Sequence, residues 1–177
     1  ILLYKAGDTV LNTLTMPFLL EIGFSKKEIA NVAKAFGITF IIIGGFSGGL
    51  LLNSRPVRFV LLLVSFLQII SSLLFMMQSC LGHNLLSLFI TIGFESFTTG
   101  LGTAAFIYYL SRHCFSPFTG THYAFLTSFG SLGRIAWSSF SGWLADQMSW
   151  TYFYGFTAVL CAPCLLLLFF SKKHFER

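Results

Sequence analysis

Two long apolar segments without a formal charge constrain this chain more than any other feature of its sequence. They cover residues 59–82 and 147–171. A helix rises about 1.5 Å per residue, so about 20 apolar residues cross the hydrocarbon core of a bilayer. Neither segment follows a basic N-terminal region, so neither has the pattern of a signal peptide. The sequence therefore predicts a protein that spans a membrane.

The composition supports this prediction and argues against several function classes. Hydrophobic residues make up 55% of the chain and charged residues only 10%, whereas soluble domains carry about 25% charged residues. The net charge of +5 comes from short loops and the C-terminal tail, which is not a nucleic-acid-binding pattern. Cys161 and Cys164 have the CxxC spacing, but they lie within an apolar segment, which favours packing over redox chemistry. We expect no enzyme activity, no cofactor, no metal and no nucleic-acid partner.

Turn signals divide the chain into six predicted transmembrane helices that form a single bundle over residues 1–177. A capping box begins at Ser25, and Pro56, Gly82 and Pro117 interrupt the apolar segments. The fold class is therefore an all-α membrane protein. The chain starts at Ile1 without Met and enters an apolar segment at once, so we expect further sequence upstream. The predicted helices lie at approximately 1–20, 26–52, 57–79, 84–111, 119–145 and 150–171.

The basic residues of the loops predict the orientation of this bundle. Cytoplasmic loops are enriched in Lys and Arg. One side holds Arg55, Arg58, Arg112, Lys172, Lys173 and Arg177, and the other holds Lys26 and Lys27. We therefore expect the former loops and both ends of the chain to be cytoplasmic. Near the opposite side, an aromatic belt at the membrane interface is predicted from Trp143, Trp150, Tyr152 and Tyr154.

Five charged residues lie within the predicted spans beyond their first turns. An ionisable group at the bilayer centre costs at least about 2.5–3.5 kcal/mol, so such groups usually face a bundle interior or a water-filled cavity. The first, second, fourth and fifth helices carry Lys5, Asp8, Lys34, Glu95 and Arg134. We expect these four helices to enclose a polar space, with the third and sixth helices packed outside against lipid.

Helical spacing aligns other polar residues with these charges. Asp8 follows Lys5 by three positions and precedes Asn12 by four, which places all three on one helix face. Glu95 begins a similar stripe in the fourth helix, and Arg134 lies within one in the fifth. A carboxyl group in a low-dielectric cavity can take up and release a proton near neutral pH. We therefore predict Glu95 and Asp8 as proton-coupling residues. The predicted translocation site comprises Lys5, Asp8, Asn12, Lys34, Glu95, Thr99, Thr103 and Arg134.

Each of these charges also has a structural interpretation. Lys5 and Asp8 are spaced to neutralise each other on one helix face. Lys34 lies close enough to a helix end to extend its ammonium group to water. Arg134 could tie its helix to Glu95. The sequence alone leaves these alternatives open.

Residues 44–49 contain two overlapping GxxxG spacings, beginning at Gly44 and Gly45. Small residues at this spacing allow two helix backbones to approach closely. The sequence does not identify which helix packs there.

The loop after the second predicted helix resembles a known sequence motif. Gly49-Leu-Leu-Leu-Asn53-Ser-Arg55-Pro-Val-Arg58 is similar to the GxxxD-R-x-G-R-[RK] loop of the major facilitator superfamily. Asn53 stands where that motif has its acid, and Pro56 where it has its glycine. The resemblance implies a gating role for Gly49, Asn53, Arg55 and Arg58.

A second resemblance to known proteins runs through the whole chain. It rests on the segments Leu3-Tyr-Lys5-Ala-Gly7-Asp8, Thr15-Met-Pro-Phe-Leu-Leu20, Gly23-Phe24-Ser25, Phe94-Glu95, Gly100-Leu-Gly102-Thr103-Ala-Ala-Phe106, Phe118-Thr119-Gly-Thr121-His122-Tyr123-Ala124, Gly133-Arg134 and Ser141-Gly142-Trp143. These segments resemble AmpG-type muropeptide permeases of the same superfamily, in the order of helices 7 to 12, the C-terminal half of a 12-helix transporter. The chain departs from the family at Ala33, Ser96 and His122, where the family has Asn, Asn and Gln.

This resemblance implies proton-driven import of anhydromuropeptides across the cytoplasmic (inner) membrane, for recycling of the cell wall. The implied partners are membrane lipid, a small anionic glycopeptide, protons and an N-terminal six-helix half, because such sites are built from both halves. Cations such as Lys5, Lys34 and Arg134 would suit the carboxylates of that substrate. The alternatives are transport of another anionic solute such as acetyl-CoA, whose transporters form a related family, or a truncated remnant that no longer transports.

Overall fold

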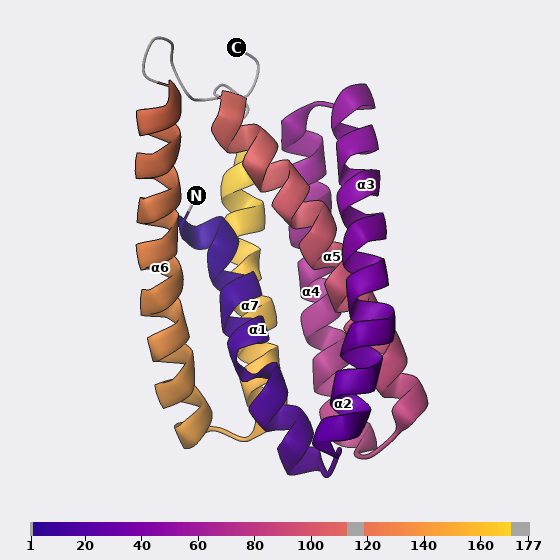
Figure 1. Ribbon diagram of the computed structural model, residues 1–177. Coiled ribbons are helices and arrows are strands. Elements are labelled where there is room, and N and C mark those ends of the chain that lie inside the picture. Colours follow the sequence, from indigo (N-terminus) through magenta and orange to yellow (C-terminus); the bar gives the residue numbers. More distant parts are fainter. Residues whose placement is uncertain (1, 113–118, 171–177) are drawn as a thin grey trace.

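The computed structural model describes residues 2–112 and 119–170, without the side chains of residues 2–6, 119, 162–164 and 166–170. Every regular element in this part of the chain is a helix (Figure 1). The predicted all-α architecture is thus confirmed for these residues. In chain order, the elements are α1 (Leu2–Ile22), α2 (Lys26–Val32), η1 (Ala33–Gly37), α3 (Ile38–Ser54), α4 (Val57–Leu81), α5 (Leu85–Arg112), α6 (Thr119–Gln147) and α7 (Trp150–Phe170).

These elements form six helical rods, because α2, η1 and α3 follow one another without a break. The rod begins at Lys26 and ends at Ser54, and η1 is a π-helical turn within it. Such turns are rare and often occur at functional sites. Helices α1, α3, α4 and α6 each extend two residues beyond the end that the sequence predicts.

The six rods run alongside one another (Figure 1), and each packs on the next in the order α3, α5, α4, α7, α1 and α6. Helix α1 packs on α6 and α7, α4 packs on α7 and α5, and α3 packs on α5. Helices α5 and α6 make little contact with each other. A space therefore remains between α5 on one side and the pair α1 and α6 on the other.

Glycines bring α3 and α5 into direct backbone contact. A methyl group at Gly44 would overlap the carbonyl oxygen of Phe97, and one at Gly100 would overlap that of Ile41. A third close approach lies one turn further along, where the same atom at Gly48 would be 3.1 Å from the Leu101 carbonyl oxygen. The helix that packs on the GxxxG segment is therefore α5.

The largest group of buried aromatic rings lies near the α1–α2 turn, where α1, α4 and α7 meet. Phe18 packs edge-on against Tyr154, with ring centroids 4.7 Å apart, and Tyr154 stacks on Phe75 at 5.2 Å. All three side chains are fully buried. The expectation of an interfacial belt is therefore wrong for Tyr154, because its ring fills the core between three helices. Trp143 and Tyr152 are exposed, as such a belt requires.

Three of the rods are long and apolar enough to cross a membrane, among the residues that the structure describes. They are Lys26–Ser54, α4 and α5. Helix α6 has a lower mean hydropathy than these three, because Ser, Thr and Gly recur through its sequence.

Helix α4 has a buried face that mixes polar and apolar residues, and an exposed apolar side of the kind that the sequence predicts against lipid. Phe66, Leu73 and Met77 are exposed on its other side. The buried polar residues of α4 are Ser65, Gln68, Ser71, Ser72 and Gln78. The sequence does not indicate that these residues are buried, because none of them is charged.

Candidate functional site

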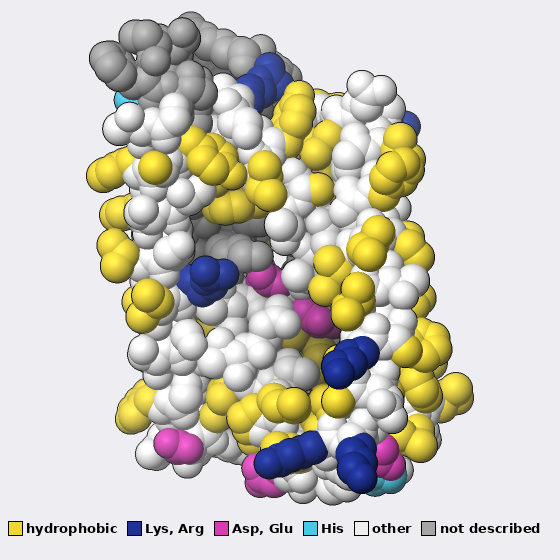
Figure 2. Space-filling model, in the orientation of Figure 1, with side chains coloured by type: hydrophobic (Ala, Val, Ile, Leu, Met, Phe, Trp, Pro, Cys, Tyr) yellow, Lys and Arg dark blue, Asp and Glu magenta, His cyan; other side chains and the backbone are white. Residues whose placement is uncertain are grey.

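A pocket of about 610 Å³ lies between α1, α5 and α6. Figure 2 shows a hollow midway along this face, with acidic and basic side chains at its edge. Its size falls within the range of about 300–1,000 Å³ that is usual for small-molecule sites. Charged and hydroxyl-bearing side chains dominate the lining: Asp8, Thr9, Asn12, Thr13, Thr99, Thr103, Arg134, Ile135, Ser138 and Ser139.

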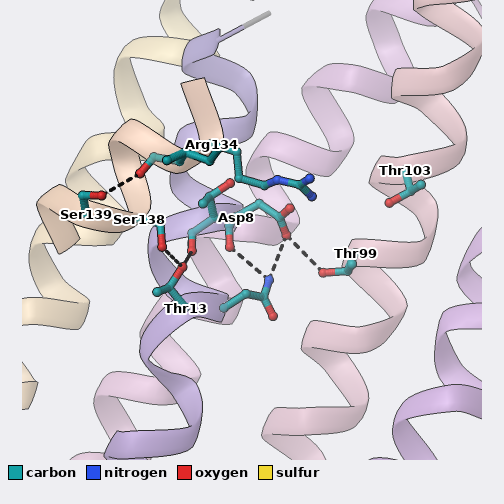
Figure 3. A pocket seen from close by; sticks show the side chains of 10 residues that line it. Asp8, Thr13, Thr99, Thr103, Arg134, Ser138 and Ser139 are labelled. Carbon is teal, nitrogen blue, oxygen red and sulfur yellow. Dashed lines mark hydrogen bonds between the residues drawn. The ribbon is translucent and has the colours of Figure 1, made fainter. Parts of the chain in front are cut away.

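Asp8 is the acidic residue of this lining, and it is half-buried. Asn12, one turn further along α1, donates through Nδ2 to Asp8 Oδ1 at 3.1 Å and to the Asp8 carbonyl oxygen at 3.0 Å. Thr99 of α5 donates to the same Oδ1 at 3.1 Å (Figure 3). The spacing of Asp8 and Asn12 along α1 and of the polar stripe along α5 brings these groups together.

Glu95 lies one turn before Thr99 on α5. The Thr99 hydroxyl, which is 3.1 Å from Asp8, is also 2.8 Å from Glu95 Oε1. Glu95 is half-buried. One hydroxyl group thus connects the carboxyl groups of two helices.

Arg134 of α6 supplies the cationic side chain of the pocket. Figure 3 shows it extending from α6 into the space that the Asp8 carboxylate also faces. A second pocket of about 250 Å³ continues past Arg134, toward Thr127 and Phe106. The guanidinium group has five fixed N–H donors, which suits it to a bidentate contact with a carboxylate.

Helices α1 and α6 are joined beside the pocket by a hydrogen bond between two hydroxyl groups. Thr13 Oγ1 lies 3.2 Å from Ser138 Oγ and 2.7 Å from the Thr9 carbonyl oxygen. Four further residues line the pocket, although the polar stripes of the sequence do not include them: Thr9, Thr13, Ile135 and Ser139. Each lies beside a residue of a polar stripe or one turn from it.

Two lysines of the predicted translocation site are not among the described lining of the pocket. The side chain of Lys5 lies outside the described residues. Lys34 lies on η1, is exposed and is not part of the pocket lining. The rod that carries Lys34 instead packs on α5 through its glycines. The lining that the structure describes therefore comes from three helices, where the sequence led us to expect four.

The loop that resembles a gating motif joins the end of α3 to the start of α4. Asn53 and Arg55 are exposed, and Gly49 is exposed one turn earlier. The Arg55 guanidinium lies 5.6 Å from the centre of the Phe59 ring, within the range of a cation–π contact. Arg58 is half-buried in the first turn of α4.

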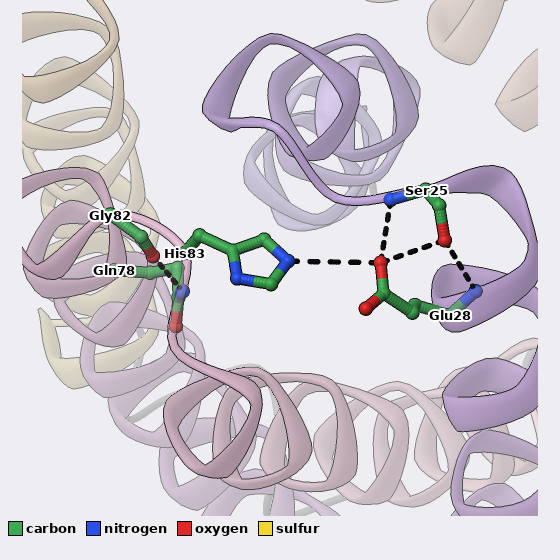
Figure 4. A network of polar contacts seen from close by, with 5 residues as sticks. All are labelled: Ser25, Glu28, Gln78, Gly82 and His83. Atoms are coloured by element: carbon green, nitrogen blue, oxygen red, sulfur yellow. Dashed lines mark hydrogen bonds and ion pairs between the residues drawn. The ribbon is translucent and has the colours of Figure 1, made fainter.

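A second polar network joins the α1–α2 turn to the α4–α5 turn (Figure 4). Ser25 caps α2 by accepting a hydrogen bond from the Glu28 backbone, and the Glu28 carboxylate accepts one from the Ser25 backbone at 2.7 Å. His83, in the α4–α5 turn, lies 3.7 Å from that carboxylate. These contacts satisfy helix-end donors and bring two turns together, which is a structural role.

Comparison with known proteins places this architecture in a family. The model of the Major Facilitator Superfamily matches residues 2–177. The chain is 34% identical over 168 residues to the protein named "Putative transporter AmpG 1" of Rickettsia prowazekii, and 34% identical over 176 residues to the protein of that name in Rickettsia felis. The corresponding protein of Rickettsia typhi is 35% identical over 168 residues.

These alignments cover 95%, 99% and 95% of this chain, but only 38%, 40% and 38% of the relatives. The chain thus spans about two fifths of the length of the curated relatives that it matches. The resemblance to AmpG transporters that the sequence motifs indicate is confirmed. The match to the family model extends over nearly every residue, and the chain belongs to the major facilitator superfamily.

Proposed function

We propose that this chain is the C-terminal half of a secondary transporter that imports anhydromuropeptides together with protons across the cytoplasmic membrane. The observation that carries the proposal is the pocket between α1, α5 and α6, in which Asp8 and Arg134 face a common space. Glu95 is linked to that space through Thr99. Acidic and basic groups thus line a cavity of ligand size between three helices.

The energetic cost of these charges supports a role in transport. Each ionisable group within a membrane span costs at least about 2.5–3.5 kcal/mol, and such groups commonly mark substrate or proton pathways. Arg134 suits a substrate that carries carboxylates, because guanidinium and carboxylate groups pair through two parallel hydrogen bonds. Asp8 and Glu95 suit proton binding. In this proposal the N-terminal half supplies the opposite wall of the site, near the bilayer midplane.

The substrate class rests on resemblance to the AmpG-type permeases. Anhydromuropeptides are disaccharide-peptides with carboxylates, which matches the cation of the pocket. The basic loops that follow α3 and α5 would face the cytoplasm, with both ends of the chain on that side.

The test is uptake of labelled anhydromuropeptide by cells that lack their own permease and express the complete gene product carrying this chain. We expect uptake that a protonophore abolishes. An absence of uptake, from protein shown to be in the membrane, would contradict this substrate. It would redirect the assignment to another anionic solute such as acetyl-CoA, or to a remnant without transport activity.

Replacement of Arg134 by Ala is expected to raise the KM of this uptake roughly 10- to 100-fold. The reason is that a hydrogen bond to a charged group is worth about 1.5–3 kcal/mol, and about 1.4 kcal/mol corresponds to a factor of ten. Lys27→Ala, which removes an exposed cation from the start of α2, is the control and should leave KM unchanged. A parental KM in R134A would place Arg134 outside the binding site. Loss of R134A from the membrane would instead identify Arg134 as a structural tie between helices.

A further inference from the structure

Thr99 lies between two carboxyl groups that belong to different helices. Its Oγ1 is 3.1 Å from Oδ1 of Asp8 on α1 and 2.8 Å from Oε1 of Glu95 on α5. The distance to Glu95 lies within the range of O–H···O hydrogen bonds, and the distance to Asp8 lies slightly above it. A threonine hydroxyl has one proton to donate and two lone pairs that accept. Thr99 therefore donates to only one of its two neighbours at a time.

The number of protons on the pair decides whether both contacts can be made. When both carboxyl groups are ionised, each accepts only, so one of them loses its contact with the Thr99 hydrogen. When one carboxyl group is protonated, its O–H donates to the Thr99 oxygen, and Thr99 donates to the other carboxylate. The geometry thus favours the state in which a single proton is held between Asp8 and Glu95.

We propose that Thr99 is a positioning residue that makes Asp8 and Glu95 bind one proton as a unit. This inference rests on the coupling role proposed for the two carboxyl groups, which it deepens. The connection joins the two sides of the pocket, because α1 packs on α6 and α7 whereas α5 packs on α3 and α4. Release of the shared proton weakens a contact that ties those sides together. Through Thr99, the protonation state of Asp8 and Glu95 therefore affects the distance between α1 and α5.

Other polar and charged groups surround the pair and contribute to its titration. Asn12 donates a second hydrogen bond to Asp8 Oδ1, and Arg134 of α6 lines the same pocket. Lys5 precedes Asp8 by one turn on α1, with a side chain outside the described residues. Lys34, on η1, is exposed. The test must therefore isolate the Thr99 hydroxyl while leaving these groups in place.

The experiment is a pH titration of carboxyl infrared bands in the complete protein, reconstituted in lipid without substrate. Bands that disappear in Asp8→Asn and in Glu95→Gln identify the two groups. Interacting carboxyl groups bind their protons in two macroscopic steps. In Thr99→Val, which removes the hydroxyl and retains the shape, we expect the two steps to move closer by about one to two pH units. That shift corresponds to a hydrogen bond to a charged group.

Two further variants separate this role from simple packing. Thr99→Ser keeps the hydroxyl and should retain the parental separation of the two steps. Thr98→Val is the matched control, because Thr98 is the buried neighbour of Thr99 on α5 and donates only within its own helix, to the Phe94 carbonyl oxygen at 2.9 Å. It should titrate like the parent.

Parental separation of the steps in Thr99→Val would overturn the inference, as would bands of Asp8 and Glu95 that never titrate. Thr99→Ala provides the same comparison where the valine variant fails to fold. Failure of the proposed function has a different signature. The pair would still respond to Thr99→Val in this titration, while uptake by Glu95→Gln continued to follow the pH gradient.

Discussion

A single methyl group at Gly44 or Gly100 is expected to destabilise the bundle by about 3 kcal/mol, because it must displace backbone rather than a flexible side chain. The Cβ of Gly44→Ala would overlap the Phe97 carbonyl oxygen, and that of Gly100→Ala the Ile41 carbonyl oxygen. Overpacking of a well-packed interface typically costs about 1–3 kcal/mol. Here the upper end is expected, because α3 and α5 must move apart along their whole contact.

The measurement is the unfolding midpoint of each variant in a mild detergent. Gly45→Ala is the matched control, because its Cβ would lie 3.9 Å from the nearest atom, the Gly100 carbonyl oxygen. Removing a helix-interior glycine should make that variant equal to the parent or more stable by about 0.5–1 kcal/mol. Equal midpoints for the Gly44 and Gly45 variants would show that the α3–α5 contact is looser than described here.

Replacement of Glu95 by Gln is expected to abolish accumulation of substrate against its gradient, while the protein still folds and enters the membrane. Glutamine keeps the shape and can still contact Thr99, but it cannot take up and release a proton. Downhill exchange of substrate between the two sides should persist, because exchange requires no net proton movement. The change therefore separates proton coupling from substrate binding.

Accumulation and exchange are measured in parallel in vesicles with and without an imposed pH gradient. Glu21→Gln, at the exposed end of α1, is the control and should accumulate substrate like the parent. Accumulation by Glu95→Gln at the parental level would exclude Glu95 as the coupling residue and leave Asp8 as the candidate. Loss of exchange together with accumulation would instead assign Glu95 to substrate binding.

The sequence predicts the helices and about half of the pocket lining because both depend on short-range periodicity. Charges in apolar spans are conspicuous, and a repeat of three and four residues shows which polar neighbours share their face. This reasoning selected Asp8, Asn12, Thr99, Thr103 and Arg134, which the structure places around one space. The helix that faces each polar stripe was not predictable, since it depends on which helices pack together.

Features without a charge or a local period were harder to predict. The inward face of α4 includes Ser and Gln among Val, Leu and Phe, and their weak polarity disappears in an apolar average. The sequence places Tyr154 near a span end, where an interfacial position is usual, but packing of three helices buries it completely. Lys34 lies in a π-helical turn, which changes the direction of its side chain relative to a regular helix and has no evident sequence signal.

We propose that substrate and protons enter together through the site that contains Asp8 and Glu95. The most direct measurement is proton movement when unlabelled anhydromuropeptide is added to proteoliposomes of the complete protein, followed with a pH-sensitive dye and without any imposed gradient. We predict saturable entry of protons that depends on substrate and is absent in Glu95→Gln. Substrate entry without proton movement in the parent protein would contradict proton-coupled import.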